Sequence, residues 1–292
     1  MTDVLAAGHV NWDVTLRVDD LPAPDAESFI RSQRGSGGGS AANVAAALSG
    51  LAVEAGLVGS VGDDQNGLLA TRELREAGVD LRGLRAVDDG ETAVKYLLVD
   101  DDGEVSVLGN DGANEAVAPD DIDPAYVRES RHVHLTSQRP DTAARLAELA
   151  TAAGIPVSID PGRRLGERDF SRAVELADVI FLNEPEAETA LDRPPAEAFP
   201  GQTLVCKRGA DGAAVYGPDG RADHPGFDID PEDTTGAGDA FAAGFIATRL
   251  DGGDLHRQLA VGNACGALAA REEGARTAPD RERVERYLTE RE

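Results

Sequence analysis

The middle of the chain alternates between short apolar runs and longer amphipathic runs, and this alternation restricts the possible folds more than any other feature. Apolar runs of this length predict buried strands, and the amphipathic runs between them predict helices. The predicted order is strand 132–136, helix 141–153, strand 156–160, helix 169–177, strand 179–182, helix 184–191 and strand 203–207. Strands that alternate with helices form a parallel sheet with helices on both faces. We therefore predict an α/β protein with a mostly parallel central sheet.

Four further strands are predicted that do not alternate with helices. They cover residues 14–18, 28–33, 91–99 and 104–108. Because no crossover helix connects them to the central sheet, they predict a small sheet of their own. The predicted organisation is a single α/β domain over residues 1–292, in which strands from about 13–34 and 91–113 form a small β subdomain.

The charge of the chain is extreme. Its 292 residues carry a formal net charge of −26, and lysine occurs only at Lys95 and Lys207. An acidic surface that is poor in lysine is typical of a halophilic protein in a salt-rich cytoplasm, where high ionic strength screens self-repulsion. The same charge argues against a nucleic-acid partner, because binding a polyanion requires a basic surface.

The two cysteines, Cys206 and Cys265, lie far apart in the sequence, each within an apolar run. They are predicted to be small core residues in a reducing compartment, not a disulfide or a metal site. The N-terminus lacks the basic and apolar regions of a signal peptide, and no apolar run approaches the roughly 20 residues of a membrane span. These features predict a cytoplasmic protein without a membrane partner.

One short stretch combines a flexible turn with a helix start, namely Asp233-Thr234-Thr235-Gly236-Ala237-Gly238-Asp239. Two glycines allow a tight turn, and the small apolar residues that follow predict a buried helix over 237–250. The first amides of a helix lack internal partners and suit a phosphate or a developing oxyanion. Asp239 lies at this rim, where a carboxylate can take a proton from a hydroxyl that attacks phosphorus. The alternative is an ordinary capped helix start.

A second glycine-rich stretch runs from Gly35 to Asn43 and leads into an Ala- and Leu-rich helix that ends near Gly50. Glycines here let backbone amides approach a ligand closely. A buried strand predicted over residues 4–10 delivers polar side chains at its tip, where Asp13 offers a carboxylate that accepts hydrogen bonds and Asn11 can both donate and accept. Each stretch thus offers polar groups to a ligand, and we call the two together the cradle. The alternatives are a flexible linker and turn-forming Asn and Asp.

These motifs span essentially the whole chain and resemble those of the ribokinase family, the PfkB-type carbohydrate kinases. On this resemblance Asp239 is the catalytic base. The family's anion hole corresponds to the amides of Gly236, Ala237 and Gly238, and its sugar-binding residues correspond to Asn11, Asp13, Gly38, Gly39 and Asn43. The implied fold is a ribokinase-like three-layer α/β/α arrangement with a mostly parallel central sheet and a small β-sheet lid.

The resemblance also implies sites for ATP and metal ions. The residues expected to contact the nucleotide are Asn183, Lys207, Gly209, Gly212, Asn263 and Gly274. Lys207 stands where the family usually has threonine, so it adds a cation near the β- or γ-phosphate. Glu186 is expected to hold Mg²⁺ through water, with a helix N-cap as the alternative. Asp233 and Thr235 resemble the carbonyl donors of a monovalent-cation site, for K⁺, in some members.

Arg164 follows the predicted strand 156–160 and resembles an arginine found at this place in several sugar kinases. It is predicted to bind substrate, either by neutralising phosphate charge or by pairing with a substrate carboxylate. The alternative is an ordinary surface arginine.

We predict ATP-dependent phosphorylation of a hydroxymethyl group on a sugar of ribose, fructose or ketodeoxy-sugar type. A nucleoside kinase is the alternative within the family, because the segments around Thr136, Ser158 and Asn183 also resemble an archaeal nucleoside kinase branch. Trp12, beside the acceptor residues, is a candidate to stack on a base. A catalytically silent sugar-binding regulator is the alternative from another class. The lid is expected to exclude water and to form a homodimer, as in relatives.

Overall fold

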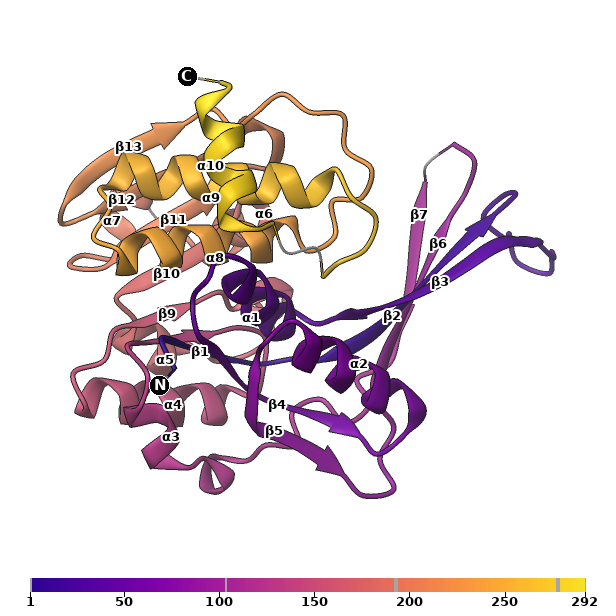
Figure 1. The fold of residues 1–292 in the computed structure, drawn as a ribbon, viewed down its shortest axis with the longest axis horizontal. Helices are drawn as coiled ribbons and strands as arrows, with labels where there is room; N and C mark the ends of the chain where they lie inside the picture. Colours follow the sequence, from indigo (N-terminus) through magenta and orange to yellow (C-terminus); the bar gives the residue numbers. More distant parts are fainter. Residues whose placement is uncertain (1, 103, 192–193, 277–278, 292) are drawn as a thin grey trace.

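The computed structural model describes residues 2–102, 104–191, 194–276 and 279–291, and Figure 1 shows the arrangement of its helices and strands. In these ranges the larger sheet has the spatial order β13-β12-β11-β10-β9-β8-β1-β4-β5. Its strands are β1 (Val4–Ala7), β4 (Ala55–Gly62), β5 (Asp80–Val87), β8 (His132–Leu135), β9 (Val157–Ile159), β10 (Val179–Asn183), β11 (Thr203–Lys207), β12 (Ala213–Gly217) and β13 (Gly220–His224). The strands from β5 to β11 are parallel, and β12 and β13 continue the sheet antiparallel at one edge.

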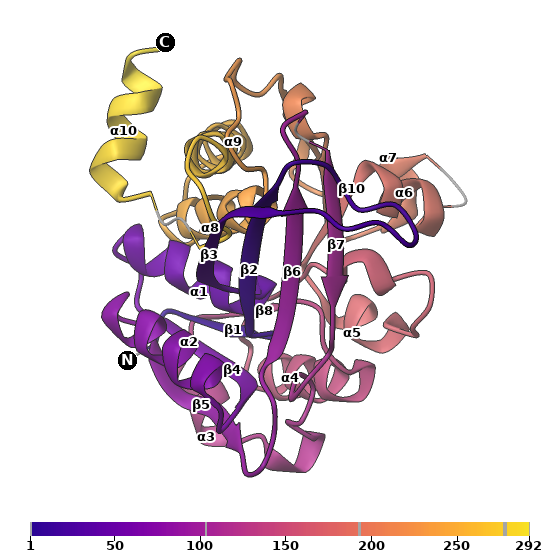
Figure 2. The same cartoon turned by 90° about the vertical axis from the view of Figure 1, so that its right-hand side faces the viewer.

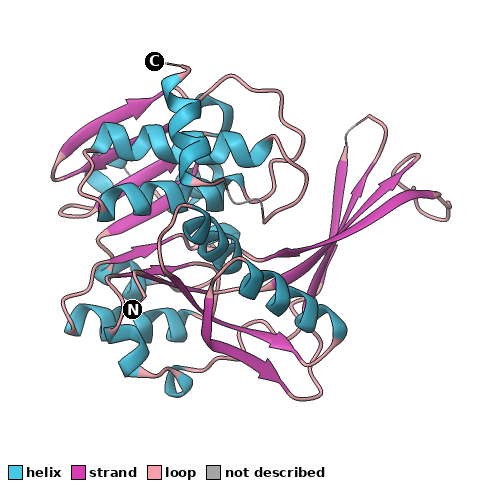
Figure 3. Ribbon diagram, in the orientation of Figure 1, coloured by secondary structure: helices cyan, strands magenta, loops and turns pink. Residues whose placement is uncertain are grey.

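Helices cover both faces of this sheet, as Figure 3 shows. On one face lie α1 (Ser40–Gly50), α2 (Gln65–Glu76), α8 (Ala237–Leu250), α9 (Leu255–Ala270) and α10 (Arg281–Thr289). On the other lie α3 (Pro124–Arg128), α4 (Pro140–Ala152), α5 (Ser171–Leu176), α6 (Glu184–Ala190) and α7 (Pro195–Ala198). Each face has its own apolar core, one centred on Phe181 and Phe245 and the other on Leu135 and Leu146. The predicted three-layer α/β/α fold is confirmed.

The second sheet has the order β3-β2-β6-β7 and projects from one side of the body, as Figures 1 and 2 show. Its strands are β2 (Asn11–Val18), β3 (Ile30–Gly38), β6 (Ala93–Val99) and β7 (Val105–Gly109). We call this sheet the lid. The glycines after Gly35 were expected to open a helix, but β3 continues through Gly38, which pairs with Asn11. A Cβ on Gly38 would lie 2.1 Å from the Asp13 carboxylate, so only glycine fits beside that side chain.

The sequence did not predict β5, α3, α7 or β13. The edge strand β5 alternates poorly, because Arg82 and Arg85 interrupt its apolar residues and remain half exposed or more. Charged side chains of this kind protect the open edge of a sheet from pairing with another chain.

Both cysteines are free and buried, as predicted. No helix in the described ranges is long and apolar enough to cross a membrane.

The strand order reverses between β1 and β8, because the chain builds the sheet outward from this point in both directions. In such sheets, loops at the carboxyl ends of the strands separate at the reversal and leave a crevice for ligands. Three polar residues emerge at these ends. Asp160 directly follows β9, and Asn183 and Lys207 are the last residues of β10 and β11, paired with each other in the sheet register. The topology therefore gathers residues far apart in sequence at one edge.

Candidate active site

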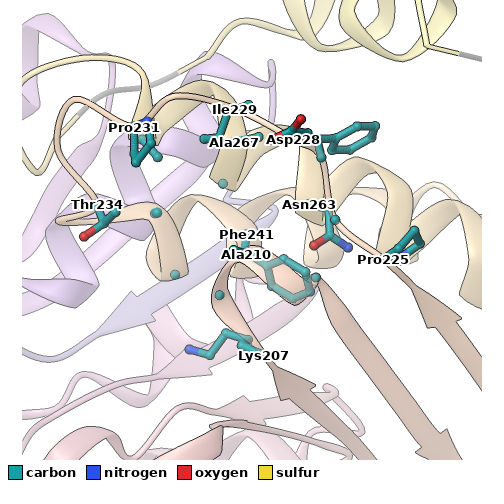
Figure 4. A pocket seen from close by; sticks show the side chains of 18 of the residues that line it. Lys207, Ala210, Pro225, Asp228, Ile229, Pro231, Thr234, Phe241, Asn263 and Ala267 are labelled. Atoms are coloured by element: carbon teal, nitrogen blue, oxygen red, sulfur yellow. The ribbon is translucent and has the colours of Figure 1, made fainter.

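Two cavities meet above the carboxyl ends of the central strands. The apolar cavity, about 550 Å³, lies between the segment after β11, residues 225–234 and helices α8 and α9 (Figure 4). The polar cavity, about 610 Å³, lies between the lid, the loop after β9 and the start of α8. The residues that line both are Asn183, Lys207, Thr234 and Gly238. A group that passes from one cavity to the other passes these four residues.

The start of α8 forms part of both walls. Gly236 has a φ of 78° at the N-cap, and a Cβ there would lie 2.0 Å from the carbonyl oxygen of Ala275, so the turn requires glycine. The Ala237 amide donates to the Thr234 carbonyl at 3.2 Å. In the described ranges the amides of Gly236 and Gly238 have no such partner. Of the three predicted anion-hole amides, these two are therefore free to bind a ligand.

Asp239 lies in the polar cavity and faces the residues contributed by the first fifty positions. Its Oδ2 accepts a hydrogen bond of 2.8 Å from Nδ2 of Asn43, on helix α1. Burial raises the pKa of Asp239 to about 6, although the Asn43 hydrogen bond opposes this shift. A carboxylate with a pKa near the operating pH is well suited to act as a general base. The predicted base and the predicted cradle thus occupy one cavity.

Asp13 and Asn43 present unsatisfied acceptors to this cavity. The Asp13 side chain on β2 is buried, and burial raises its pKa to about 6 against the nearby charges of Lys95 and Arg276. Oδ1 of Asp13 and Oδ1 of Asn43 are buried and have no hydrogen-bond partner in the described structure. Buried polar atoms are rarely left in this state, so both oxygens fit hydroxyl donors of a bound ligand.

Asn11 also lines the polar cavity, and a loop that the sequence analysis did not single out holds it in place. Asn114 donates from Nδ2 to Oδ1 of Asn11 at 2.7 Å and accepts at Oδ1 from the Val10 amide at 3.1 Å. The polar stretch from Asn110 to Asn114 follows the lid hairpin directly. Two asparagines and a glycine in that stretch were the available signal for a functional loop.

Lys207 provides the charge at the junction of the cavities. Its ammonium forms a buried ion pair with Asp160. Burial lowers the pKa of Lys207, but Asp160, Glu186 and Asp239 outweigh it and hold the pKa above its ordinary value. A Cβ on Gly238 would lie 3.5 Å from Nζ, so the ammonium stands beside one of the free amides. The ammonium and the amide thus stand side by side at the junction, where both can contact an anionic group.

Asn183 and Glu186 form a reciprocal cap at the start of α6. The Asn183 side chain accepts from the Glu186 amide at 2.9 Å, and Glu186 accepts from the Asn183 amide at 3.0 Å. The N-cap alternative is therefore present in the structure, but Glu186 also lines the polar cavity. Burial, with a contribution from Asp160, raises the pKa of Glu186. The described residues contain no cluster of three or more side chains able to hold a metal without other ligands.

Most residues predicted to bind nucleotide lie around the apolar cavity, some of them labelled in Figure 4. Gly209, Gly212 and Asn263 line it, in addition to the two junction residues. Gly274 does not, so its placement does not support the nucleotide role. Its amide donates to Oδ2 of Asp233 at 3.1 Å, and Gly274 lines a different cavity.

The monovalent-cation prediction concerns the loop before α8. Oδ1 of Asp233 accepts from the Thr235 amide at 2.8 Å, so the side chain of Asp233 stabilises its own loop. Only backbone carbonyls there remain for a cation, and the site stays a prediction.

Arg164 lines the polar cavity, but carboxylates already balance its charge. It bonds to Asp111 at 2.6 Å and lies 3.6 Å from Glu115. Two other cations that line this cavity, Lys95 and Arg163, were not predicted. Nothing in their local sequence marks them, because only the fold brings lid and body together.

Trp12 does not line the polar cavity, so the prediction that it stacks on a base is wrong. Its side chain is buried in the core, and its ring lies 2.9 Å from the position of a Cβ on Gly35. Side chains alternate along β2, so Asn11 and Asp13 face the cavity while Trp12 faces the opposite way.

The chain is similar to known carbohydrate and nucleoside kinases. Residues 1–282 match the family described as pfkB family carbohydrate kinase. An ATP-dependent ribose-1-phosphate kinase of Halopiger xanaduensis is 62% identical over 294 residues, covering 100% of this chain and 99% of the relative. A nucleoside kinase of Methanothermobacter thermautotrophicus is 30% identical, covering 99% and 96%.

Solved structures show the same fold. The nucleoside kinase of Methanocaldococcus jannaschii has a TM-score of 0.86 at 24% identity, covering 99% of each chain. The ribokinase of Arabidopsis thaliana, complexed with ribose and ATP, has a TM-score of 0.87 at 24% identity and the same coverage. The predicted family, fold and kinase activity are confirmed. The chain is a sugar or nucleoside kinase that belongs to the pfkB family of carbohydrate kinases.

Proposed function

We propose that this kinase transfers the γ-phosphoryl group of ATP to the hydroxymethyl group of ribose 1-phosphate. The observation that carries the proposal is the polar cavity, which combines unsatisfied hydroxyl acceptors with four lysine and arginine side chains and has no Phe, Tyr or Trp among the described residues that line it. The four cations suit the phosphate of a phosphorylated sugar, and the unsatisfied acceptors suit its hydroxyls. The full-length similarity to a ribose-1-phosphate kinase supports the same acceptor.

In the proposed reaction each group of residues around the junction has one role. Asp13 and Asn43 accept hydrogen bonds from the sugar hydroxyls and hold the acceptor in place. Asp239 takes the proton of the attacking hydroxyl as the new O–P bond forms. The free amides of Gly236 and Gly238 stabilise charge on the transferred phosphoryl group.

Lys207 adds a full positive charge at the same point. It lines both cavities and stands beside Gly238, so its ammonium is placed to contact the phosphoryl group as it passes from ATP to the acceptor. Asp160 keeps the ammonium protonated and fixed in direction. Arg164 is proposed to support the loop rather than to bind substrate, because carboxylates occupy it.

When bound, Mg²⁺ would neutralise the charge of the ATP phosphates during the transfer. Glu186 fits a water-mediated role, because one carboxylate oxygen is engaged by the Asn183 amide while the side chain lines the polar cavity. K⁺ at the carbonyls of Asp233 and Thr235 is a separate prediction. Activity in KCl against choline chloride at equal ionic strength tests it.

An acceptor screen tests the proposed function. ADP release is measured at high KCl with ribose 1-phosphate, ribose, fructose, a ketodeoxy-sugar acid and adenosine. We expect the highest kcat/KM for ribose 1-phosphate. A higher value for adenosine would establish the nucleoside alternative, which the 30% identical nucleoside kinase favours. No ADP release with any acceptor would favour the silent regulator.

We further propose that the protein is a homodimer joined through the lid. In the described ranges seven large apolar side chains are exposed, and six of them belong to the lid or its connecting segment: Phe29, Ile30, Tyr96, Val105, Val107 and Leu108. Apolar surface gathered in this way marks an interaction site. Light scattering should give twice the mass of one chain, and Leu108→Glu should give the monomer. A wild-type monomer contradicts the proposal.

The cellular location and the salt conditions proposed for this protein follow from its activity, its cysteines and its charge. An enzyme that uses ATP and buries two free thiols fits a cytoplasmic location. The net charge of −26 fits halophilic conditions.

A further inference from the structure

The chain has only two lysines, and both line the polar cavity. Apart from five histidines, every other basic residue in the sequence is an arginine. An ammonium is a compact point charge that suits a phosphate, whereas a guanidinium prefers flat, two-pronged partners. The position of Lys207 at the junction of the cavities and its ion pair with Asp160 explain its presence there. Lys95 has no such role, and its place in the cavity requires another explanation.

Lys95 lies on lid strand β6, in register with Asp13 on the neighbouring strand β2. It therefore projects from the lid on the side that holds the sugar hydroxyls. Its charge lowers the pKa of Asp13 and that of Asp239, so it acts within the site. In the described part of the chain its ammonium forms no ion pair.

Arg163 reaches the same cavity from the body, in the short helical turn that follows β9. No carboxylate among the described residues pairs with it, whereas the adjacent Arg164 pairs with Asp111 and Glu115. The chain has 54 acidic residues against 28 basic ones, so partners for a cation are abundant. Two unpaired cations that face one cavity from two walls indicate an anionic ligand.

We propose that Lys95 and Arg163 bind the phosphate group that the acceptor already carries, and so select a sugar phosphate over a free sugar. This inference rests on the proposed function and deepens it. Asp13 and Asn43 hold the hydroxyls, and the phosphate joins a lid residue to a body residue. The acceptor's own phosphate thereby helps to hold the lid against the body.

Kinetics of Lys95→Gln and Arg163→Gln, with ribose 1-phosphate and ribose as paired acceptors, test the proposal. In each variant the ratio of kcat/KM for ribose 1-phosphate to that for ribose should fall about tenfold, the size expected for one charged hydrogen bond. Lys95→Arg should recover part of the ratio. If Lys95 served only to offset the buried charge of Asp13, both acceptors would weaken alike and the ratio would stay at the wild-type value. That result overturns the proposal.

Arg31→Gln is the matched control, because Arg31 lies on lid strand β3 and pairs with Asp19 and Asp101 outside the cavity. It removes one charge from the lid and should leave the ratio unchanged. Where turnover of ribose is too slow to measure, dissociation constants for ribose 1-phosphate can be measured by calorimetry without ATP. They allow the same comparison between the variants and the wild type. A wild-type enzyme that prefers ribose or adenosine overturns the proposed function. A wild-type preference for ribose 1-phosphate that survives both substitutions overturns only the phosphate subsite.

Discussion

The two cavities that meet at Lys207 have similar volumes but different walls. The apolar cavity is formed by small and apolar residues of α8, α9 and residues 225–234, with Phe241 and Ile229 among them. The polar cavity is lined by carboxylates, amides and cations from the lid, the β9 loop and the start of α8. The first suits a flat base that every ATP-using relative must bind, and the second suits one acceptor. From this difference we expect acceptor specificity to reside in the polar cavity, whose walls are charged and come from distant segments.

The largest expected effect is on the polar side. Asp239→Asn should lower kcat by roughly 10² to 10⁴, because the hydroxyl loses its base, and should change the KM for ATP little. Steady-state kinetics at saturating acceptor measure it. Asp251→Asn, at the C-cap of the same helix α8, is the control and should retain wild-type kcat. A kcat near wild type for Asp239→Asn would remove Asp239 from the mechanism.

A change at the junction should affect both cavities. Lys207→Gln is expected to lower kcat by roughly 10 to 10², because a charged contact to the phosphoryl group is lost. Lys207→Arg should recover only part, since the guanidinium does not fit the buried pocket beside Asp160. Pre-steady-state measurement of the phosphoryl-transfer step checks this. An effect confined to the KM for ATP would make Lys207 a simple nucleotide contact.

Low pH should impair the carboxylates of the polar cavity before it affects the apolar cavity. Asp13 and Asp239 both have pKa values raised to about 6, so kcat/KM for the acceptor should fall at least tenfold per pH unit below 6. In the folded protein the pKa of each carboxyl exceeds the ordinary 3.8. Each carboxyl therefore adds to the free energy of unfolding below about pH 4, and this contribution is lost as the pH rises through 6. Asp239→Asn should therefore raise Tm at pH 8. A pH profile that is flat down to pH 5 would contradict the raised values.

In the apolar cavity, a larger side chain should weaken only the binding of the nucleotide. Ala267→Leu places extra volume in the wall of the apolar cavity and should raise the KM for ATP by roughly tenfold. The KM for the acceptor should change less than twofold, as initial rates with each substrate varied in turn will show. An equal rise in both KM values would mean that the two cavities do not act separately.

The smallest effect concerns the whole surface. KCl should raise Tm by several degrees between low and molar concentration, because it screens the self-repulsion of a net charge of −26. Thermal unfolding followed by circular dichroism measures it, with choline chloride as a test of specific K⁺ binding. Salt-independent stability would remove the halophilic interpretation.

The sequence predicted the parts of this site that depend on local structure. The turn at Gly236 requires a particular backbone conformation, so residues 233–239 reveal it directly. Strands such as β11 and helices such as α8 were placed with the observed bounds, because their apolar periodicity is strong.

Other parts depend on how distant segments meet, and local patterns did not reveal them. Lys95, Arg163 and Asn114 reach the polar cavity only because the lid lies over the body. Trp12 was misplaced for a related reason. The sequence shows that it neighbours Asp13, but the direction of each side chain depends on the register of β2 within the lid.

The hydrogen bond between Asn43 and Asp239 joins positions 196 apart in the chain. A ribosome must therefore synthesise most of the protein before Asp239 can meet Asn43. With Asp239 as the proposed base, a chain released before residue 239 should not turn over ATP, and two separately expressed fragments divided between these positions should show activity only when they associate.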